Sequence, residues 1–91
     1  MSAMFEVAHT NVQGVDFLVA LVKSRVLTSL REQQDLTAFF QSEYGPIPVV
    51  FATQRSDGQV EYRGRTDIVR FLGSVYFEQL PWERVTFRTA A

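Results

Sequence analysis

The chain has 91 residues, of which 46% are hydrophobic and 13% aromatic, with nine basic and ten acidic side chains and no cysteine. A chain of this length fits one domain, so residues 1–91 are expected to share a single core. The apolar content excludes a disordered protein. The absence of cysteine excludes thiolate metal sites and redox pairs, and it points to a reducing compartment, which we predict to be the cytoplasm.

The charge balance and the apolar runs also limit the partners that we expect. A formal net charge of −1 argues against nucleic-acid binding, which usually depends on a basic excess. The longest apolar run, Val15 to Val22, contains Asp16 and is too short to span a bilayer. Residues 1–6 show no basic region followed by an apolar core, so we predict no signal peptide and no membrane association.

The eight phenylalanines give this chain more large apolar side chains than a domain of its size readily buries. Obligate interfaces between subunits resemble a domain core cut in half. The excess therefore predicts that a second subunit covers part of the apolar surface, in a homodimer or in a complex with another protein.

The first half of the chain predicts one strand and two helices. Residues 4–9 alternate weakly, with Phe5 and Val7 on one face, which is typical of a short strand. Apolar residues recur at intervals of three and four between residues 15 and 31, which predicts a long helix that is buried on more than one side, at Val15, Leu18, Val19, Val22, Val26 and Leu30. Asp35 is expected to cap a second helix that ends at Glu43.

A hairpin follows in the second half. Residues 47–54 have the apolar and β-branched composition of a strand. The pair Asp57-Gly58 is the strongest turn signal in the chain, because both residues tolerate positive φ. The returning strand is predicted for residues 59–63, with Val60 and Tyr62 facing the core.

A third helix and a last strand complete the predicted elements. Thr66 is expected to cap this helix, and Asp67 places a negative charge in its first turn. Phe71 lies in the middle of its apolar stripe, so we expect Phe71→Ala to cost ~3–5 kcal/mol. Residues 82–88 alternate as a strand. The predicted fold is α+β, with three helices packed on one face of a small, mainly antiparallel sheet in the order β-α-α-β-β-α-β.

Two groups of residues are candidate sites. His9 is the only histidine, and no motif supplies the partner that a general base or a metal site needs, so we predict neither catalysis nor a metal or other cofactor there. Arginines accompany aromatic residues on the last two strands and in the turn after the first of them, at Tyr62, Arg63, Arg65, Trp82 and Arg84. This composition suits a bound anion or a protein partner. If these two strands are neighbours, the arginines can converge. The alternative is a solvated sheet face with Arg–Glu pairs across strands.

Residues 35–87 resemble the ketosteroid-isomerase-like, or nuclear-transport-factor-like, cone family. The similarity rests on Asp35-Leu36-Thr37-Ala38-Phe39-Phe40, on Val49-Val50-Phe51, on the stretch from Val60 to Leu72 and on Val85-Thr86-Phe87. The resemblance implies a cone that holds a small apolar molecule, in an enzyme or in a non-enzymatic dimer. The family continues with further long strands where this chain ends, so the resemblance assigns no catalytic residue here.

A second resemblance is to the back half of a thioredoxin-like domain, through Ile47-Pro48-Val49-Val50-Phe51. Without cysteine such a domain has no redox chemistry. Two functional hypotheses follow for the whole chain. The first is a small non-enzymatic binding or assembly module that forms a dimer. The second is a small apolar-ligand-binding protein or minimal enzyme, with a cavity of roughly 300 Å³ or more.

Overall fold

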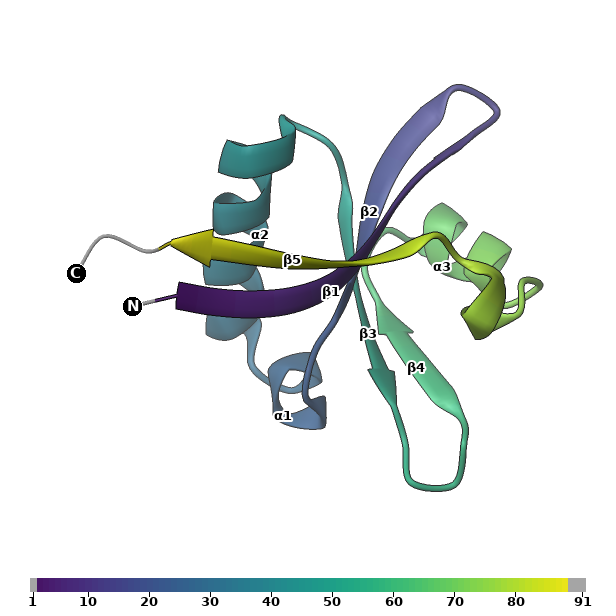
Figure 1. Cartoon of the computed structure of the whole chain (residues 1–91). Coiled ribbons are helices and arrows are strands. Elements are labelled where there is room, and N and C mark those ends of the chain that lie inside the picture. Colours follow the sequence, from purple (N-terminus) through teal and green to yellow (C-terminus); the bar gives the residue numbers. More distant parts are fainter. Residues whose placement is uncertain (1, 89–91) are drawn as a thin grey trace.

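A five-stranded sheet with helices on both faces forms the protein (Figure 1). The computed structural model describes residues 2–88, and it describes side chains between residues 4 and 86. The sheet has the order β4-β3-β2-β1-β5, and only the pair β2–β3 is parallel. In chain order the elements are β1 (Ser2–Val12), β2 (Val15–Leu21), α1 (Ser24–Leu27), α2 (Leu30–Tyr44), β3 (Val49–Gln54), β4 (Val60–Arg63), α3 (Thr66–Leu72), the 3₁₀ turn η1 (Phe77–Gln79) and β5 (Trp82–Arg88).

The first hairpin replaces the long helix that was predicted for residues 15–31. Gln13 and Gly14 both have positive φ, 51° and 81°, which is the geometry of a two-residue hairpin turn. Strand β2 then pairs with β1 over its whole length, from Val12↔Val15 to Glu6↔Leu21. The prediction was wrong because a strand that is covered on both faces is apolar at consecutive positions, and such a run also satisfies helical spacing.

Helices α1 and α2 make the crossover that joins the parallel strands β2 and β3. The Ser29 hydroxyl accepts a hydrogen bond from the Glu32 backbone N–H at 3.3 Å and so caps α2. Gly45, with φ of 96°, ends α2 as expected, and its N–H donates to the Gln41 carbonyl. The helix predicted between Asp35 and Glu43 is present, but the prediction that Asp35 caps it was wrong, because α2 begins at Leu30 and Asp35 lies inside it.

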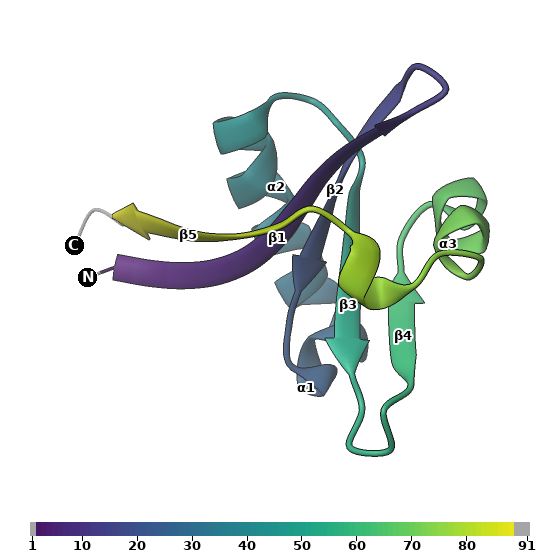
Figure 2. The same ribbon diagram turned by 45° about the vertical axis from the view of Figure 1, so that its right-hand side comes forward.

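The helices lie on opposite faces of the sheet, not on one face as predicted (Figures 1 and 2). Successive residues of β2 alternate between two core clusters. Leu18 and Ala20 join the cluster beneath α1 and α2, whereas Phe17 and Val19 join the cluster beneath α3 and η1. A central strand that is apolar on both sides needs a cover on each, which explains the difference.

The second half follows the predictions more closely. The hairpin β3–β4 forms around Gly58, which has φ of 86°, and Val60 and Tyr62 pack against the α3-side cluster. Strand β5 has the predicted bounds, and it pairs with β1. Two details of α3 differ from the prediction. The N-cap is Arg65, whose side chain does not cap the helix, and not Thr66. The buried residues are Ile68 and Leu72, and not Phe71.

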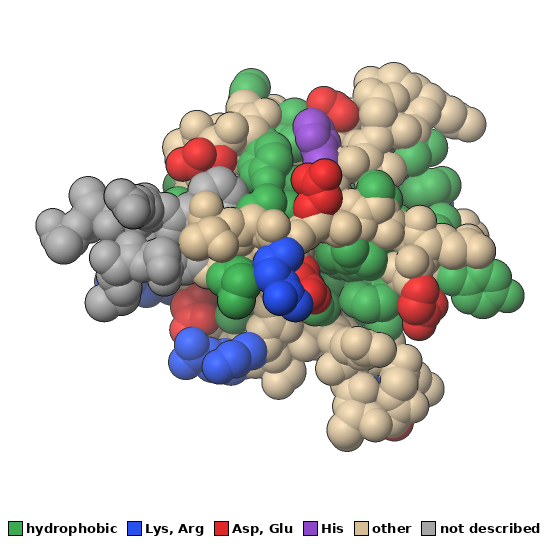
Figure 3. Space-filling view, in the orientation of Figure 1, with side chains coloured by type: hydrophobic (Ala, Val, Ile, Leu, Met, Phe, Trp, Pro, Cys, Tyr) green, Lys and Arg blue, Asp and Glu red, His purple; other side chains and the backbone are tan. Residues whose placement is uncertain are grey.

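The α+β class, three helices and a mainly antiparallel sheet are thus confirmed, whereas the predicted order lacks β2. Among the described residues, no helix combines the length and the apolar character that a membrane crossing needs. The face drawn in Figure 3 shows acidic and basic side chains scattered among apolar ones, without a patch of one sign.

Candidate functional site

The main candidate is an open groove beside α1, of about 640 Å³, which we call the α1 groove. Its lining comes from the early part of β1, from the end of β2, from α1 and from the first turns of α2: Met4, Phe5, Leu21, Val22, Lys23, Arg25, Val26, Glu32, Asp35 and Leu36. Ligand sites are typically concave, mainly apolar and about 300–1,000 Å³ in volume. The α1 groove has these properties.

The chain path at the end of β2 creates this groove. The Val22 N–H donates to the Ala52 carbonyl at 2.8 Å, which holds the chain to β3 one residue beyond the strand. The chain then turns at Lys23 into α1, a helix of only four residues whose Val26 and Leu27 are buried. Because α1 is so short, it leaves the space between the start of α2 and the early part of β1 unfilled.

The base of the α1 groove is apolar and is supported from below. Phe5 packs against the rings of Phe39 and Phe40, with ring centroids 6.0 Å and 5.1 Å apart. Val26 is buried, and Leu36 is half-buried on α2. A base backed by packed aromatic rings is preformed, so a ligand would lose little affinity to reorganisation of the protein.

The charges of the α1 groove come from two elements, with the basic residues beside α1 and the acidic residues on α2. Lys23 and Arg25 are exposed on the side of α1, and neither forms an ion pair among the described residues. Glu32 and Asp35 lie on the side of α2. The walls therefore offer both signs of charge above an apolar base.

A second groove, of about 790 Å³, adjoins the first on the side of β3 and β4, and we call it the polar groove. It shares Leu21, Val22 and Lys23 with the α1 groove. The residues that it adds are all polar: Ser24, Thr53, Gln54, Arg55, Ser56 and Glu61. Both grooves lie at the carboxyl ends of the parallel strands β2 and β3, the edge where open α/β sheets bind ligands.

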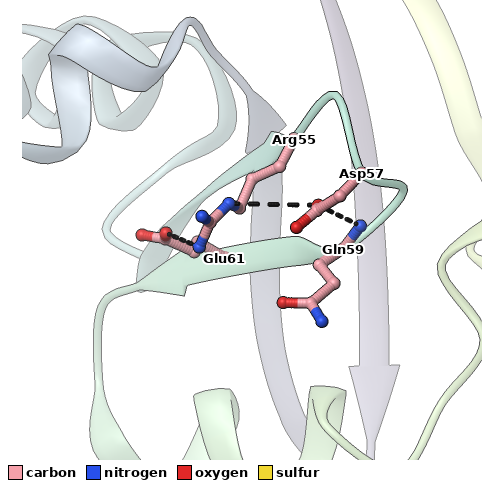
Figure 4. Close-up of polar contacts among 4 residues, drawn as sticks. All are labelled: Arg55, Asp57, Gln59 and Glu61. Carbon is pink, nitrogen blue, oxygen red and sulfur yellow. Dashed lines mark hydrogen bonds and ion pairs between the residues drawn. The ribbon is translucent and has the colours of Figure 1, made fainter.

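The β3–β4 hairpin fixes the charges on the outer wall of the polar groove (Figure 4). Arg55 Nη1 lies 3.0 Å from Glu61 Oε1, and Arg55 Nε lies 4.0 Å from Asp57 Oδ1. The same Asp57 oxygen accepts a hydrogen bond from the Gln59 N–H at 3.0 Å, which holds the turn. Arg55 is thus neutralised by carboxylates of its own hairpin.

A third depression, of about 370 Å³, lies on the other side of α2, toward β4. Its helical wall, which we call the α2 flank, has no charged residue: Leu30, Gln33, Gln34, Thr37, Ala38 and Gln41. Leu30 is 69% exposed there. Val49 and Phe51 form the base, and Arg63 lies on the far wall.

The structure does not bring the predicted arginines together. Arg63 lies on β4 and Arg84 on β5, and these strands are the two opposite edges of the sheet. Arg84 Nη2 lies 3.5 Å from Glu6 Oε1, an Arg–Glu pair across strands. Arg65 makes two bonds of 2.8 Å to Asp67, and these hydrogen bonds lower the pKa of the Asp67 carboxyl.

The two aromatic members of the predicted site, Tyr62 and Trp82, both pack against the α3-side cluster. Trp82 Nε1 donates to the Phe77 carbonyl at 2.8 Å, and the rings of Phe77 and Trp82 lie 4.8 Å apart. Burial and then the negative charge of Glu78 raise the pKa of Tyr62. Both rings are thus packed at the edge of the core.

His9 is an exposed residue within β1, and Figure 3 shows the histidine in purple beside acidic side chains. Its Nε2 is 3.3 Å from Asp16 Oδ2, and its ring meets Tyr44 edge-on at 5.7 Å. Burial, followed by Glu83, raises the pKa of Tyr44. His9 lines neither the α1 groove nor the polar groove, and the described residues hold no metal-binding cluster of His, Asp or Glu.

Comparison with protein families, with curated proteins and with solved structures finds no match to this chain. The candidate site therefore rests on geometry. Sequence reasoning missed both grooves because residues 15–31 were assigned to one helix. The available signal was Lys23-Ser24-Arg25, a polar triplet directly after an apolar run, which marks the end of a buried strand.

Proposed function

We propose that this protein is a small, non-enzymatic binding module that takes the apolar part of a small molecule into the α1 groove. The observation that carries the proposal is the open space of about 640 Å³ above Phe5, Val22, Val26 and Leu36. Burial of an apolar group there would gain roughly 25 cal/mol for each Å² of apolar surface removed from water. A bound apolar molecule is also what the resemblance to the cone family implies.

The side chains around the α1 groove favour binding over catalysis. Apart from carboxylates and lysine, the side chains that most often act as bases or nucleophiles are histidine, serine, threonine and tyrosine. None of these four is among the lining residues of the α1 groove. Its charged residues Lys23, Arg25 and Asp35 are exposed to water, whereas catalytic groups typically act in sites that exclude water. We therefore propose retention of a ligand, without turnover.

Leu36→Gln should weaken binding of the neutral fluorescent probe N-phenyl-1-naphthylamine about fivefold, because it replaces apolar lining with an amide. Fluorescence titration measures the affinity. Leu30→Gln is the matched control, because Leu30 lies on the same helix outside the α1 groove and should leave the affinity unchanged. Circular dichroism verifies that both variants fold. Equal affinities for Leu36→Gln and the unmodified chain would contradict the proposal.

The α2 flank favours a second function, assembly into a homodimer. A two-fold interface brings each residue near the axis close to its own copy, so a charge there would meet a like charge. None of the six α2-flank residues is charged, and the exposed Leu30 and the small Ala38 allow close packing. Depletion of charge is the compositional mark of interface cores. We propose a second copy of this chain as the occupant.

Ala38→Glu should shift the protein to the monomer, because it places two carboxylates beside the two-fold axis. Sedimentation velocity over a concentration series measures the change. Gln79→Glu adds the same charge at an exposed residue of η1, on the other face of the sheet, so it should leave the dimer intact. A chain that sediments as a monomer at every concentration would exclude the dimer.

A further inference from the structure

The α1 groove and the polar groove meet at the end of β2, and this junction indicates which class of molecule the site takes. Leu21, Val22 and Lys23 line both grooves. One side of the junction is apolar, with Phe5 and Val26, while the other side carries hydroxyl and amide groups. A molecule that spans both must be apolar at one end and polar at the other.

The charge at the junction is positive and uncompensated. In the polar groove, Arg55 is paired with Glu61 at 3.0 Å, so these two charges cancel. Lys23 is the other charged residue of that groove, and it has no ion pair among the described residues. The acidic residues of the α1 groove, Glu32 and Asp35, lie on the α2 side, away from the shared edge.

The hydrogen-bonding groups beside Lys23 suit an anion. Thr53 is 5% exposed, the one polar residue in the core of the described chain, and it lines the polar groove. Its hydroxyl makes no hydrogen bond within the described residues. Ser24 adds a second hydroxyl to the same groove. Hydroxyl and ammonium donors together bind a carboxylate in charge-assisted hydrogen bonds.

We infer that the ligand is a single-chain amphipathic carboxylate. Its apolar chain lies in the α1 groove, and its carboxylate lies beside Lys23 and Thr53 in the polar groove. This inference rests on the proposed function, because it extends the apolar site by a head-group site. The chain as a whole has a net charge of −1, so an attraction for anions must come from this local arrangement.

Competition with N-phenyl-1-naphthylamine tests the inference, with dodecanoate and dodecanol as competitors below their micelle concentrations. We expect dodecanoate to bind about fivefold tighter than dodecanol, and we expect added salt to reduce this difference. Lys23→Gln should abolish the preference for dodecanoate over dodecanol. Arg31→Gln removes an exposed cation of α2 that lines neither groove and should keep the preference.

The outcomes separate the head group from the groove. Equal affinities for dodecanoate and dodecanol would overturn the carboxylate site and leave the apolar groove standing. An equal loss of preference in Lys23→Gln and Arg31→Gln would also overturn it, because the attraction would then be a property of the overall charge. Failure of the probe and of both competitors to bind would reject the proposed function itself.

Discussion

Replacement of Phe40 by alanine is expected to lower the free energy of unfolding by about 3–5 kcal/mol. The Phe40 side chain is 0% exposed, and it belongs to the cluster of Val7, Leu18 and Phe51 beneath α2. Its ring meets Phe5 edge-on at 5.1 Å. Truncation leaves a cavity between helix and sheet, because the sheet beneath it cannot collapse into the space.

Urea denaturation monitored by circular dichroism measures this loss. Phe71→Ala is the informative comparison, because Phe71 is only half-buried and meets Phe17 at 6.5 Å. From its position in the apolar stripe, Phe71→Ala is expected to lower the free energy of unfolding by ~3–5 kcal/mol. With the partial burial seen in the structure, we expect a loss of about 1–2 kcal/mol. A larger loss for Phe71→Ala than for Phe40→Ala would mean that α3, not α2, covers the main core.

Gly64→Ala is expected to destabilise the protein by about 2–4 kcal/mol. Gly64 joins β4 to α3, and a methyl group on its Cα would lie 2.9 Å from Val50 Cγ2 and 3.1 Å from Val50 Cα. The second contact is with the backbone of the central sheet, which cannot move aside as a flexible side chain could. The φ of +159° adds strain for any residue with a Cβ atom.

Gly73→Ala provides the control for Gly64→Ala. Gly73 follows α3 with φ of −63°, and a Cβ there would meet the Arg70 carbonyl at an ordinary 3.4 Å. We expect its effect on the free energy of unfolding to stay within about 0.5 kcal/mol. Thermal and urea denaturation of the two variants side by side measure the difference. Equal stabilities would show that the β4–α3 connection adjusts its path at low cost.

The part of the fold that could be predicted from sequence is the part whose local signals have one interpretation. Asp57-Gly58 between two β-rich runs gives a hairpin under any tertiary arrangement. The alternation in residues 82–88 likewise gives β5, because one polar and one apolar face suit a strand. The stop at Gly45 depends only on its freedom to adopt positive φ.

The first half could not be predicted, because its signal has two interpretations. Residues 17–22 are all apolar, and such a run fits a buried helix as well as a strand covered on both faces. The local signs of the strand are the Gln13-Gly14 turn before it and the polar triplet Lys23-Ser24-Arg25 after it. A prediction that makes residues 15–31 a helix contains no central strand with two apolar faces. It therefore places all helices on one face of the sheet.

The candidate site could not be predicted for a related reason. The distance between Arg63 and Arg84 depends on the order of strands in the sheet, and no local pattern fixes which edge β5 joins. The α1 groove depends on the shortness of α1 and on contacts between Phe5 and α2, residues that are far apart in the chain. Lys23 and Arg25 could be found only as a polar interruption after β2.

The pairing of β5 with β1 has a consequence for biosynthesis. The register runs from Ser2↔Arg88 to Ala8↔Trp82. The edge of β1 that faces away from β2 can therefore be paired only after β5 has been synthesised. During translation that edge stays open until residue 88 has left the ribosome, and open edges can recruit other strands. Because such distant pairing also slows folding, the nascent chain is expected to aggregate more readily than the finished domain.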